Sequence, residues 1–237
     1  MKPVHFAADV HLEDGRPEGW QGFFSYLAGP ARSCGQLYLL GDVFHAWLGD
    51  DDRRPLAQEA IGLLRQLTEA GVGVALLWGN HDFMLGRGFA RATGAAVLGE
   101  QTVAEHGGTR ALLLHGDVLC TADQGYQRAR RLFRRPEVRF AMRHLPWAAR
   151  RRVAGRLLGG AAGRPRHADI DEVRAQEMLA AADAQVLVHG HVHQPGFAKL
   201  PDGRGRWTLP AWEPAGGPGG WLELGPEGFS QKGGWAS

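Results

Sequence analysis

Five short apolar runs in this sequence are each followed by side chains that bind metal ions. The runs are Val4–Ala8, Leu37–Leu40, Val72–Trp78, Ala111–Leu114 and Val186–Val188, and the polar residues after them are Asp9 and His11, Asp42, Asn80 and His81, His115, and His189, His191 and His193. Apolar runs of this length are typical of strands that are buried on both faces. The carboxyl ends of parallel strands meet at one edge of a sheet. We therefore expect an α/β fold in which all five polar sets lie on one rim.

Helical patterns lie between these strands. The expected helices are Gly19–Leu27, Pro55–Ala70, Phe89–Thr93 and Asp169–Ala182, with Asp169 as the N-cap of the last, and the expected closing strands are Trp207–Leu209 and Trp221–Leu224. Alternation of strands and helices predicts a sheet that is covered by helices on both faces.

The segment from about residue 123 to residue 167 departs from this alternation. Its apolar residues recur at helical spacing, with interruptions at Pro136 and Pro146, and we expect a helical cap inserted over the rim of a single domain spanning residues 1–237. Thirteen arginines and one acid, Glu137, lie between Arg128 and Arg166, although the whole chain has a net charge of only +2. Such a block is typical either of a solvated helix face or of a surface for an anionic partner, such as lipid headgroups, nucleotide phosphates or nucleic acid.

Composition indicates the size of the core and the cellular environment of this domain. An apolar fraction of 44% over 237 residues can fill a core of ordinary size. The two cysteines, Cys34 and Cys120, form no CxxC pair, so we expect a reducing, cytoplasmic environment instead of a disulfide framework. Because the sequence reaches Asp9 so soon, we expect no cleavable signal peptide, and the longest apolar runs are too short for us to expect a membrane-spanning helix.

The donor atoms indicate a pair of divalent ions. Carboxylate, amide and imidazole groups without thiolates suit manganese, zinc or iron, and they argue against a structural zinc site. The expected ligands are Asp9, His11 and His193 for one ion, Asn80, His115 and His191 for the other, and Asp42 as a bridge. Two ions about 3.5–4 Å apart polarise a phosphoryl oxygen and lower the pKa of water, so we expect hydrolysis of a phosphate ester or anhydride.

We expect His189 to support the ligands, because three alternating histidines cannot all face one site. His5, His45, His106, His144 and His167 have no such context and are expected to be ordinary core or surface residues.

Taken together, these stretches resemble the calcineurin-like metallophosphoesterase superfamily, which implies a four-layer α/β/β/α sandwich with a dinuclear metal centre. Within the superfamily, Gly41–Asp52 and Leu114–Gln127 resemble the UDP-2,3-diacylglucosamine pyrophosphatases of lipid A biosynthesis. The likeness runs from Val4 to about Trp212 and is weakest in the cap.

This resemblance implies a reaction and a setting. Such enzymes use manganese and cleave the pyrophosphate of UDP-2,3-diacylglucosamine into UMP and 2,3-diacylglucosamine 1-phosphate, with the acyl chains beneath the cap. They work as peripheral proteins at the cytoplasmic face of the inner membrane, and the resemblance gives no reason to expect nucleic acid as a partner. The residues that it assigns here are Asp42 and His81 in catalysis, and Asn80, His81, Asp123, Arg166 and His191 in substrate binding. The oligomeric state stays open.

One residue departs from the well-known branch of these enzymes, which has arginine where this chain has His81. Imidazole titrates near neutral pH and suits a general acid for an alkoxide leaving group. A pyrophosphate releases a phosphomonoester, with a second pKa near 6, which needs no such help. His81 is therefore compatible with a pyrophosphatase and also raises the expectation of an ester substrate.

Three alternatives follow from the same residues. The chain could be a broader phosphodiesterase or nucleotide pyrophosphatase, a metal-dependent nuclease, or a scaffold without activity. The aromatic residues of the basic block, Phe133, Phe140 and Trp147, lie on apolar stripes instead of forming a base-stacking series, which disfavours the nuclease. All expected ligands are present, which disfavours the scaffold.

Overall fold

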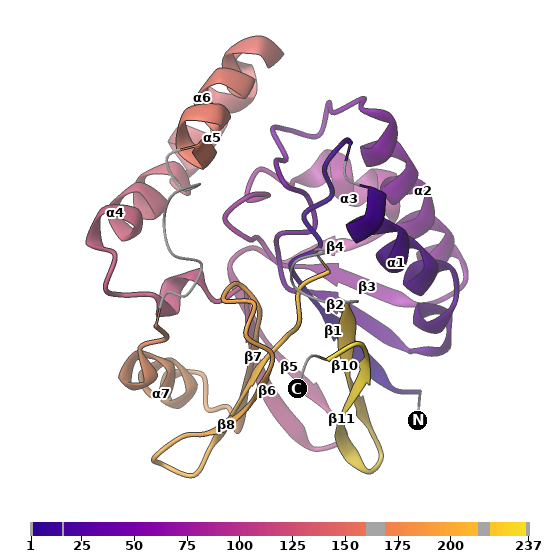
Figure 1. Cartoon of the computed structure of the whole chain (residues 1–237), viewed down its shortest axis with the longest axis vertical. Coiled ribbons are helices and arrows are strands. Elements are labelled where there is room, and N and C mark those ends of the chain that lie inside the picture. The colour runs from indigo at the N-terminus through magenta and orange to yellow at the C-terminus, as the bar shows by residue number, and fades with distance from the viewer. Residues whose placement is uncertain (1, 16, 160–168, 213–218, 236–237) are drawn as a thin grey trace.

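The computed structural model describes residues 2–15, 17–159, 169–212 and 219–235, and it contains two sheets (Figure 1). The first has six strands in the order β11-β10-β1-β2-β3-β4, and the second has five in the order β5-β6-β7-β9-β8. The strands of the first sheet are β1 (Val4–Ala7), β2 (Gln36–Leu39), β3 (Gly73–Leu76), β4 (Ala96–Val97), β10 (Gly220–Gly225) and β11 (Gly228–Gly233). Those of the second are β5 (Gln101–His106), β6 (Thr109–Leu114), β7 (Val186–His189), β8 (Gly196–Lys199) and β9 (Gly205–Thr208). Strands β1 to β4 pair in parallel, and so do β6, β7 and β9, whereas β10, β11, β5 and β8 pair antiparallel to their neighbours.

Helices cover the outer face of each sheet. The first sheet is covered by α1 (Pro17–Ala28), α2 (Pro55–Glu69) and α3 (Arg87–Thr93), and the second by α7 (Glu172–Ala181). Alternate side chains of β2 show how the layers form: Leu37 and Leu39 pack among the helices, whereas Tyr38 stacks on Phe6 between the sheets. The expected four-layer α/β/β/α sandwich is confirmed.

All five strands expected to precede the polar sets are present, with ends displaced by no more than two residues. The prediction for the last helix was wrong in one detail, because its N-cap is Asp171 and not Asp169. The Asp171 carboxylate accepts the N–H of Arg174 at 3.0 Å, which is the reach that an N-cap side chain requires. Short 3₁₀ turns occupy Pro30–Ser33 (η1) and Asp117–Leu119 (η2).

Three helices occupy the segment that was expected to form a cap. They are α4 (Gln124–Phe133), α5 (Pro136–His144) and α6 (Trp147–Gly159), and the two prolines stand at the starts of the second and third. Figure 1 shows them away from the two sheets, on the opposite side of the molecule from α1 and α2. Met142 of α5 is buried against the core of the first sheet, whereas Phe140 is 66% exposed. Among the described residues, no helix is both long and apolar enough to cross a membrane.

Candidate metal centre

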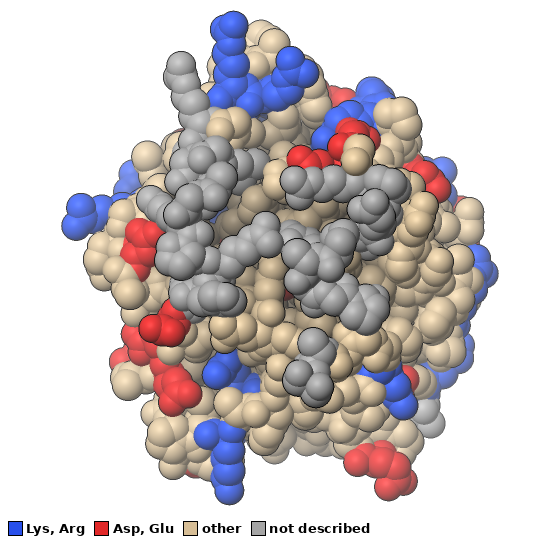
Figure 2. Space-filling model, viewed as in Figure 1, with Lys and Arg blue, Asp and Glu red and all other residues tan. Residues whose placement is uncertain are grey.

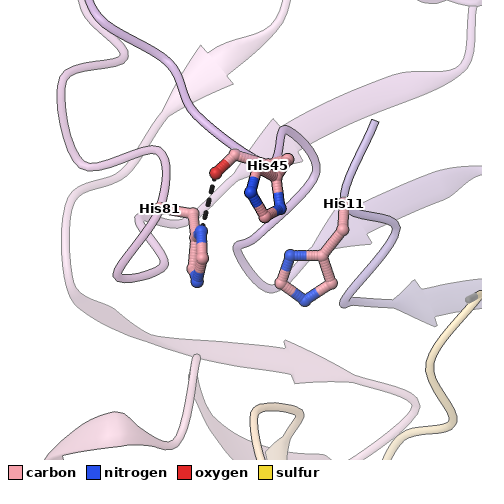
Figure 3. A group of neighbouring side chains, drawn as sticks. All are labelled: His11, His45 and His81. Atoms are coloured by element: carbon pink, nitrogen blue, oxygen red, sulfur yellow. Dashed lines mark hydrogen bonds between the residues drawn. The ribbon is translucent and has the colours of Figure 1, made fainter. Parts of the chain in front are cut away.

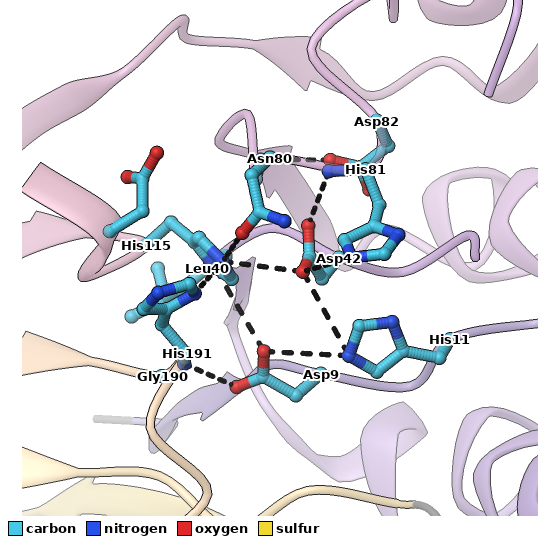
Figure 4. A network of polar contacts seen from close by, with 12 residues as sticks. Asp9, His11, Leu40, Asp42, Asn80, His81, Asp82, His115, Gly190 and His191 are labelled. Atoms are coloured by element: carbon cyan, nitrogen blue, oxygen red, sulfur yellow. Dashed lines mark hydrogen bonds and ion pairs between the residues drawn. The ribbon is translucent and has the colours of Figure 1, made fainter. Parts of the chain in front are cut away.

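The expected metal ligands meet at the carboxyl ends of five strands. Asp9, Asp42, Asn80, His115 and His191 follow β1, β2, β3, β6 and β7, each within four residues of the strand end. Figure 4 shows these side chains pointing from their separate loops into one shared space. The fold therefore brings together residues that are up to 182 positions apart in the sequence, as between Asp9 and His191.

Five of the expected ligands have left-handed backbone conformations. Their φ angles are 57° for Asp9, 51° for His11, 54° for Asp42, 75° for His191 and 52° for His193. Among the described residues, Asp183 is the one other non-glycine residue with a positive φ. Such a conformation costs about 1–3 kcal/mol per residue and persists only where the surroundings hold it. Here the N–H groups of Val10 and His11 both donate to the Asp42 carbonyl at 2.9 Å, which ties the first two loops together.

One candidate ion site consists of Asp9, His11 and His193, whose donor atoms lie within 4.8 Å of one another. Oδ2 of Asp9 accepts the backbone N–H of His191 at 2.8 Å. Within the described chain, Oδ1 of Asp9 is buried and has no hydrogen-bond donor, and it lies 3.5 Å from Nε2 of His193 and 3.9 Å from Nε2 of His11. A buried carboxylate oxygen between two imidazole nitrogens, all too far apart for good hydrogen bonds, fits a divalent ion.

A second candidate site consists of Asp42, His115 and His191. Nε2 of His115 lies 3.3 Å from Oδ2 of Asp42, 3.2 Å from Nδ1 of His191 and 3.0 Å from Oδ1 of Asn80. Oδ1 of Asp42 accepts the N–H of His81 at 2.9 Å, so Oδ2 is the oxygen that faces the site. This same oxygen lies 3.8 Å from Nε2 of His11 in the first group. Asp42 is therefore placed between the two groups, as a bridging ligand would be.

The electrostatics of the site favour bound cations. Burial opposes ionisation of Asp9 and Asp42, yet the surrounding histidines hold the pKa of both carboxyls below the ordinary value. Burial lowers the pKa of His11 to about 3 and that of His191 to about 4, so both imidazoles are neutral at physiological pH, as metal ligands must be. Burial also disfavours a charge on His115, but the Asp42 carboxylate raises its pKa to about 10. A positive charge is thus stabilised where the second ion would lie.

Support for the ligands comes partly from residues that the sequence analysis did not assign. The two oxygens of Asp82 accept the N–H groups of Val43 and Gly79, both at 2.8 Å, which fixes the loop after β3 against the loop after β2. Burial and the nearby Asp42 raise the pKa of Asp82 to about 6. Gly79 has to be glycine, because a Cβ atom there would lie 1.9 Å from Oδ1 of Asp42. The supporting role of Asp82 could have been inferred from the G-N-H-D string, in which this aspartate stands two residues after the expected ligand Asn80.

His11, His45 and His81 form a third group of adjacent imidazoles (Figure 3). The Nδ1 atom of His81 donates to the backbone carbonyl of His45 at 2.6 Å, which fixes the tautomer and leaves Nε2 at 3.9 Å from Oδ2 of Asp42. His45 was expected to be an ordinary residue, because it follows no strand end. Its position beside His81 results from the course of the loop after Asp42, which the sequence pattern does not show.

Comparison with known proteins agrees with this geometry. Residues 2–195 match the family described as calcineurin-like phosphoesterase. The chain belongs to that family.

Several curated relatives of this calcineurin-like phosphoesterase are bacterial proteins named UDP-2,3-diacylglucosamine hydrolase. One from Pseudomonas syringae pv. tomato is 40% identical over 218 residues, which cover 86% of this chain and 88% of that protein. One from Pseudomonas putida is 41% identical over 198 residues, which cover 81% and 82%. Among solved structures, vacuolar protein sorting 29 from Cryptosporidium parvum has a TM-score of 0.52 at 16% identity, covering 98% of this chain and 86% of that one, which shows the shared fold.

His189 and Asp123 make contacts outside the two candidate ion sites of this phosphoesterase. His189 is buried outside the three histidine-containing groups of the described chain, and its Nε2 lies 3.1 Å from Nη1 of Arg206 and 3.2 Å from Oγ1 of Thr208. Asp123 is the N-cap of α4 and accepts the N–H of Tyr126 at 2.8 Å. Arg166 lies outside the described residues.

Asp117, the last residue of the H-G-D string, attaches α4 to the rim. Its Oδ2 atom accepts hydrogen bonds from the hydroxyl of Tyr126, Nε of Arg130 and Nη2 of Arg134, each at 2.8 Å. Arg134 also donates to the carbonyl of Gly79 at 2.9 Å, next to the expected ligand Asn80. Burial acts against the Asp117 charge, but Arg134 and Arg130 hold the pKa of this carboxyl well below its usual value. One aspartate thus connects the second sheet, the helical insertion and the metal centre.

We expect Asp117→Asn to destabilise the protein by about 3 kcal/mol, because breaking a buried ion pair leaves two arginines without their main counter-charge. The free energy of unfolding should be measured by urea denaturation in the presence of a chelator, so that metal binding does not contribute. Asp202→Asn is the matched control, since its exposed pair with Arg204 spans only two residues and should leave the midpoint unchanged. Equal effects of the two substitutions would contradict the assigned role of Asp117.

Proposed function

We propose that this chain hydrolyses the pyrophosphate bond of UDP-2,3-diacylglucosamine to UMP and 2,3-diacylglucosamine 1-phosphate, using two divalent ions. The observation that carries the proposal is the position of Oδ2 of Asp42 between two groups of donor atoms. The relatives that bear this activity in their name support the substrate, because they match this chain over more than four fifths of both lengths.

The donor set supports the metal and the charge of the substrate. The two candidate groups contain carboxylates and imidazoles and no thiolate, which suits manganese. When bound, two such ions would polarise a phosphoryl oxygen and lower the pKa of a water molecule. The two buried carboxylates, Asp9 and Asp42, balance only half of the four positive charges. The protein therefore leaves a net positive site for the pyrophosphate, with Asn80 and His191 at its edge.

His81 has a defined part in this proposal. Because its Nδ1 proton is held by the His45 carbonyl, Nε2 accepts a hydrogen bond when the ring is neutral and donates one when the ring is protonated. A protonated His81 can therefore stabilise charge on a leaving phosphate, which is the role that an arginine would have in the same place. It can also transfer the proton to an alkoxide. This second ability favours one alternative function, a phosphodiesterase that acts on small diesters.

The helical insertion supports a substrate with a lipid part. We propose that α4, α5 and α6, together with Asp123 and Arg166, form a cap over the rim and help to bind the substrate. Figure 2 shows Lys and Arg side chains gathered at the top of the view, where Figure 1 shows α5 and α6. Cationic and apolar side chains together suit an anionic bilayer surface, and we propose peripheral association with the cytoplasmic face of the inner membrane.

The direct experiment is incubation of the manganese-loaded protein with UDP-2,3-diacylglucosamine, with detection of UMP. A small chromogenic phosphodiester serves as the comparison substrate. Release of UMP at a rate well above that of the diester supports the pyrophosphatase. Equal rates, or cleavage of the diester alone, would favour the phosphodiesterase instead.

We expect Asp42→Asn to reduce kcat/KM for either substrate by at least about 1,000-fold, which corresponds to about 4 kcal/mol of transition-state stabilisation. The substitution keeps an oxygen for the His81 N–H but removes the charge that both donor groups share. The bound metal should be measured by mass spectrometry and should fall below that of the unsubstituted protein. Unchanged metal content with full activity would contradict the bridging role.

We expect His81→Ala to slow hydrolysis of an alkyl phosphodiester by about 100-fold or more, and to slow pyrophosphate hydrolysis much less, because only the alkoxide needs a general acid. Turnover of both substrates should be measured under saturating manganese. His45→Ala is the matched control, since it removes the neighbouring imidazole but keeps the carbonyl that orients His81. Equal losses on the two substrates would show that His81 does not act on the leaving group.

A further inference from the structure

A second cavity, of about 680 Å³, lies between the loop at residues 49–53, helix α3 and helix α5, and it contains none of the seven expected metal ligands. Its wall includes Trp78, Leu85 and Val97. Six of its lining residues are arginines: Arg53, Arg87, Arg91, Arg139, Arg143 and Arg150. Four of the six, Arg53, Arg87, Arg91 and Arg143, are exposed to solvent, so the cavity is an open basic groove.

The two acidic residues that line this cavity, Asp50 and Asp51, already have hydrogen-bond or ion-pair partners within the protein. Asp51 forms a bidentate pair with Arg150, with contacts of 2.7 and 2.5 Å. Asp50 accepts the backbone N–H groups of Gly86 and Gly88 and the indole N–H of Trp47. Within the described parts of the chain, the other five arginines of the cavity have no carboxylate within ion-pair distance. The cavity therefore has a large surplus of positive charge.

The arrangement of these arginines also costs stability. Arg87 and Arg91 stand four residues apart on α3, and Arg139 and Arg143 stand four residues apart on α5. Like charges at this spacing lie on one helix face and destabilise the helix. Two such pairs, from helices far apart in the sequence, face the same space. An anion between them would relieve both repulsions at once.

Arg139 shows the strongest need for an anion. Its guanidinium lies 3.7 Å from the ring centroid of Trp78, and Nη2 donates to the carbonyl of Leu85 at 3.4 Å. The Nε atom is buried and has no hydrogen-bond acceptor among the described residues. Burial lowers the pKa of Arg139 to about 10, and the neighbouring Arg143 and Arg134 add to this effect. A partly buried cation whose Nε donor is unused favours a bound oxyanion.

Guanidinium groups select phosphate, because their planar fork matches two phosphate oxygens. The surroundings of the cavity indicate a phosphate that is attached to an apolar group. Trp78, Leu85 and Val97 form an apolar part of the wall beside the arginines. Phe140 and Leu98, which follow the lining residues Arg139 and Val97 in the sequence, are 66% and 39% exposed. Exposed aromatic and aliphatic side chains beside arginines are typical of proteins that lie on an anionic bilayer.

We propose that this cavity binds the phosphate group of an anionic membrane lipid other than the substrate, and that it thereby orients the rim toward the bilayer. This inference rests on the proposed membrane association and gives it a defined site. The lipid phosphate lies between α3 and α5, and Phe140 and Leu98 contact the acyl region.

The test measures binding of the full-length protein to vesicles of phosphatidylcholine with and without 30% phosphatidylglycerol by co-flotation. Two double variants remove charge from opposite walls of the cavity, Arg139→Gln with Arg143→Gln, and Arg87→Gln with Arg91→Gln. Each should raise the anionic-lipid concentration for half-maximal binding by about tenfold or more, because it removes two guanidinium groups that would contact the lipid phosphate directly, and the loss should exceed that of two cations outside the cavity. Binding to pure phosphatidylcholine should be weak for all proteins.

Arg151→Gln with Arg152→Gln is the matched control, because these exposed arginines of α6 carry the same charge but do not line the cavity. An equal loss in this control would overturn the proposal in favour of a diffuse basic surface. If millimolar glycerol 3-phosphate binds the cavity as tightly as the vesicles do and displaces them, the lipid is not the source of the phosphate. The same conclusion would follow if the protein bound an oligonucleotide through the cavity arginines and did not bind vesicles. Hydrolysis of the small chromogenic diester, measured on every variant, separates these outcomes from a failure of the proposed function and shows that each variant is folded.

Discussion

Two buried carboxylates at the ends of neighbouring parallel strands are the feature on which the rest of this structure depends. Removing a carboxylate from water costs several kcal/mol even after the protein relaxes, and here two of them, Asp9 and Asp42, are almost completely inaccessible. One oxygen of each accepts a backbone N–H, from His191 and from His81 respectively. The other oxygen of each points into the common space. Cations in that space would offset the burial of both charges, and the imidazoles directed at it supply nitrogen atoms that could hold them.

The same requirement determines the backbone around the site. Adjacent strands lie about 4.8 Å apart, so the ends of β1 and β2 bring their loops within reach of one another. The loops must then turn sharply to aim Asp9 and His11 at the same point, which they do through left-handed conformations that L-residues seldom adopt. The strain is held by hydrogen bonds between the two loops and by glycines such as Gly79, where any side chain would collide with Asp42. The packed sheets of the sandwich are rigid enough to hold these strained loops in place.

The sequence predicts the parts of this protein in which a local pattern and the tertiary environment agree. Strands that are mostly buried on both faces, such as β3 and β7, are largely apolar runs and were found correctly. The edge strands β4, β5, β8 and β11 were missed, because β4 has two residues and the exposed residues of the other three break the apolar pattern. The role of Asp117 could not be predicted, because its partners Arg130 and Arg134 belong to a helix whose orientation depends on packing. The position of His45 beside His81 could not be predicted for a similar reason, since only the course of the loop brings the two together.

The arginine-rich insertion shows why composition alone left two interpretations open. Part of its charge is used within the fold, because Arg130 and Arg134 neutralise Asp117 and Glu100, and Arg150 neutralises Asp51. Another part, Arg139 and Arg143, has no acid partner in the described structure and instead faces two more arginines across a cavity. A count of charges treats these two groups alike, although the first stabilises the folded protein and the second destabilises it. A surplus of positive charge that destabilises the protein is explained by a ligand that supplies negative charge. The unpaired arginines of the cavity, and not the basic block as a whole, therefore point to an anionic partner.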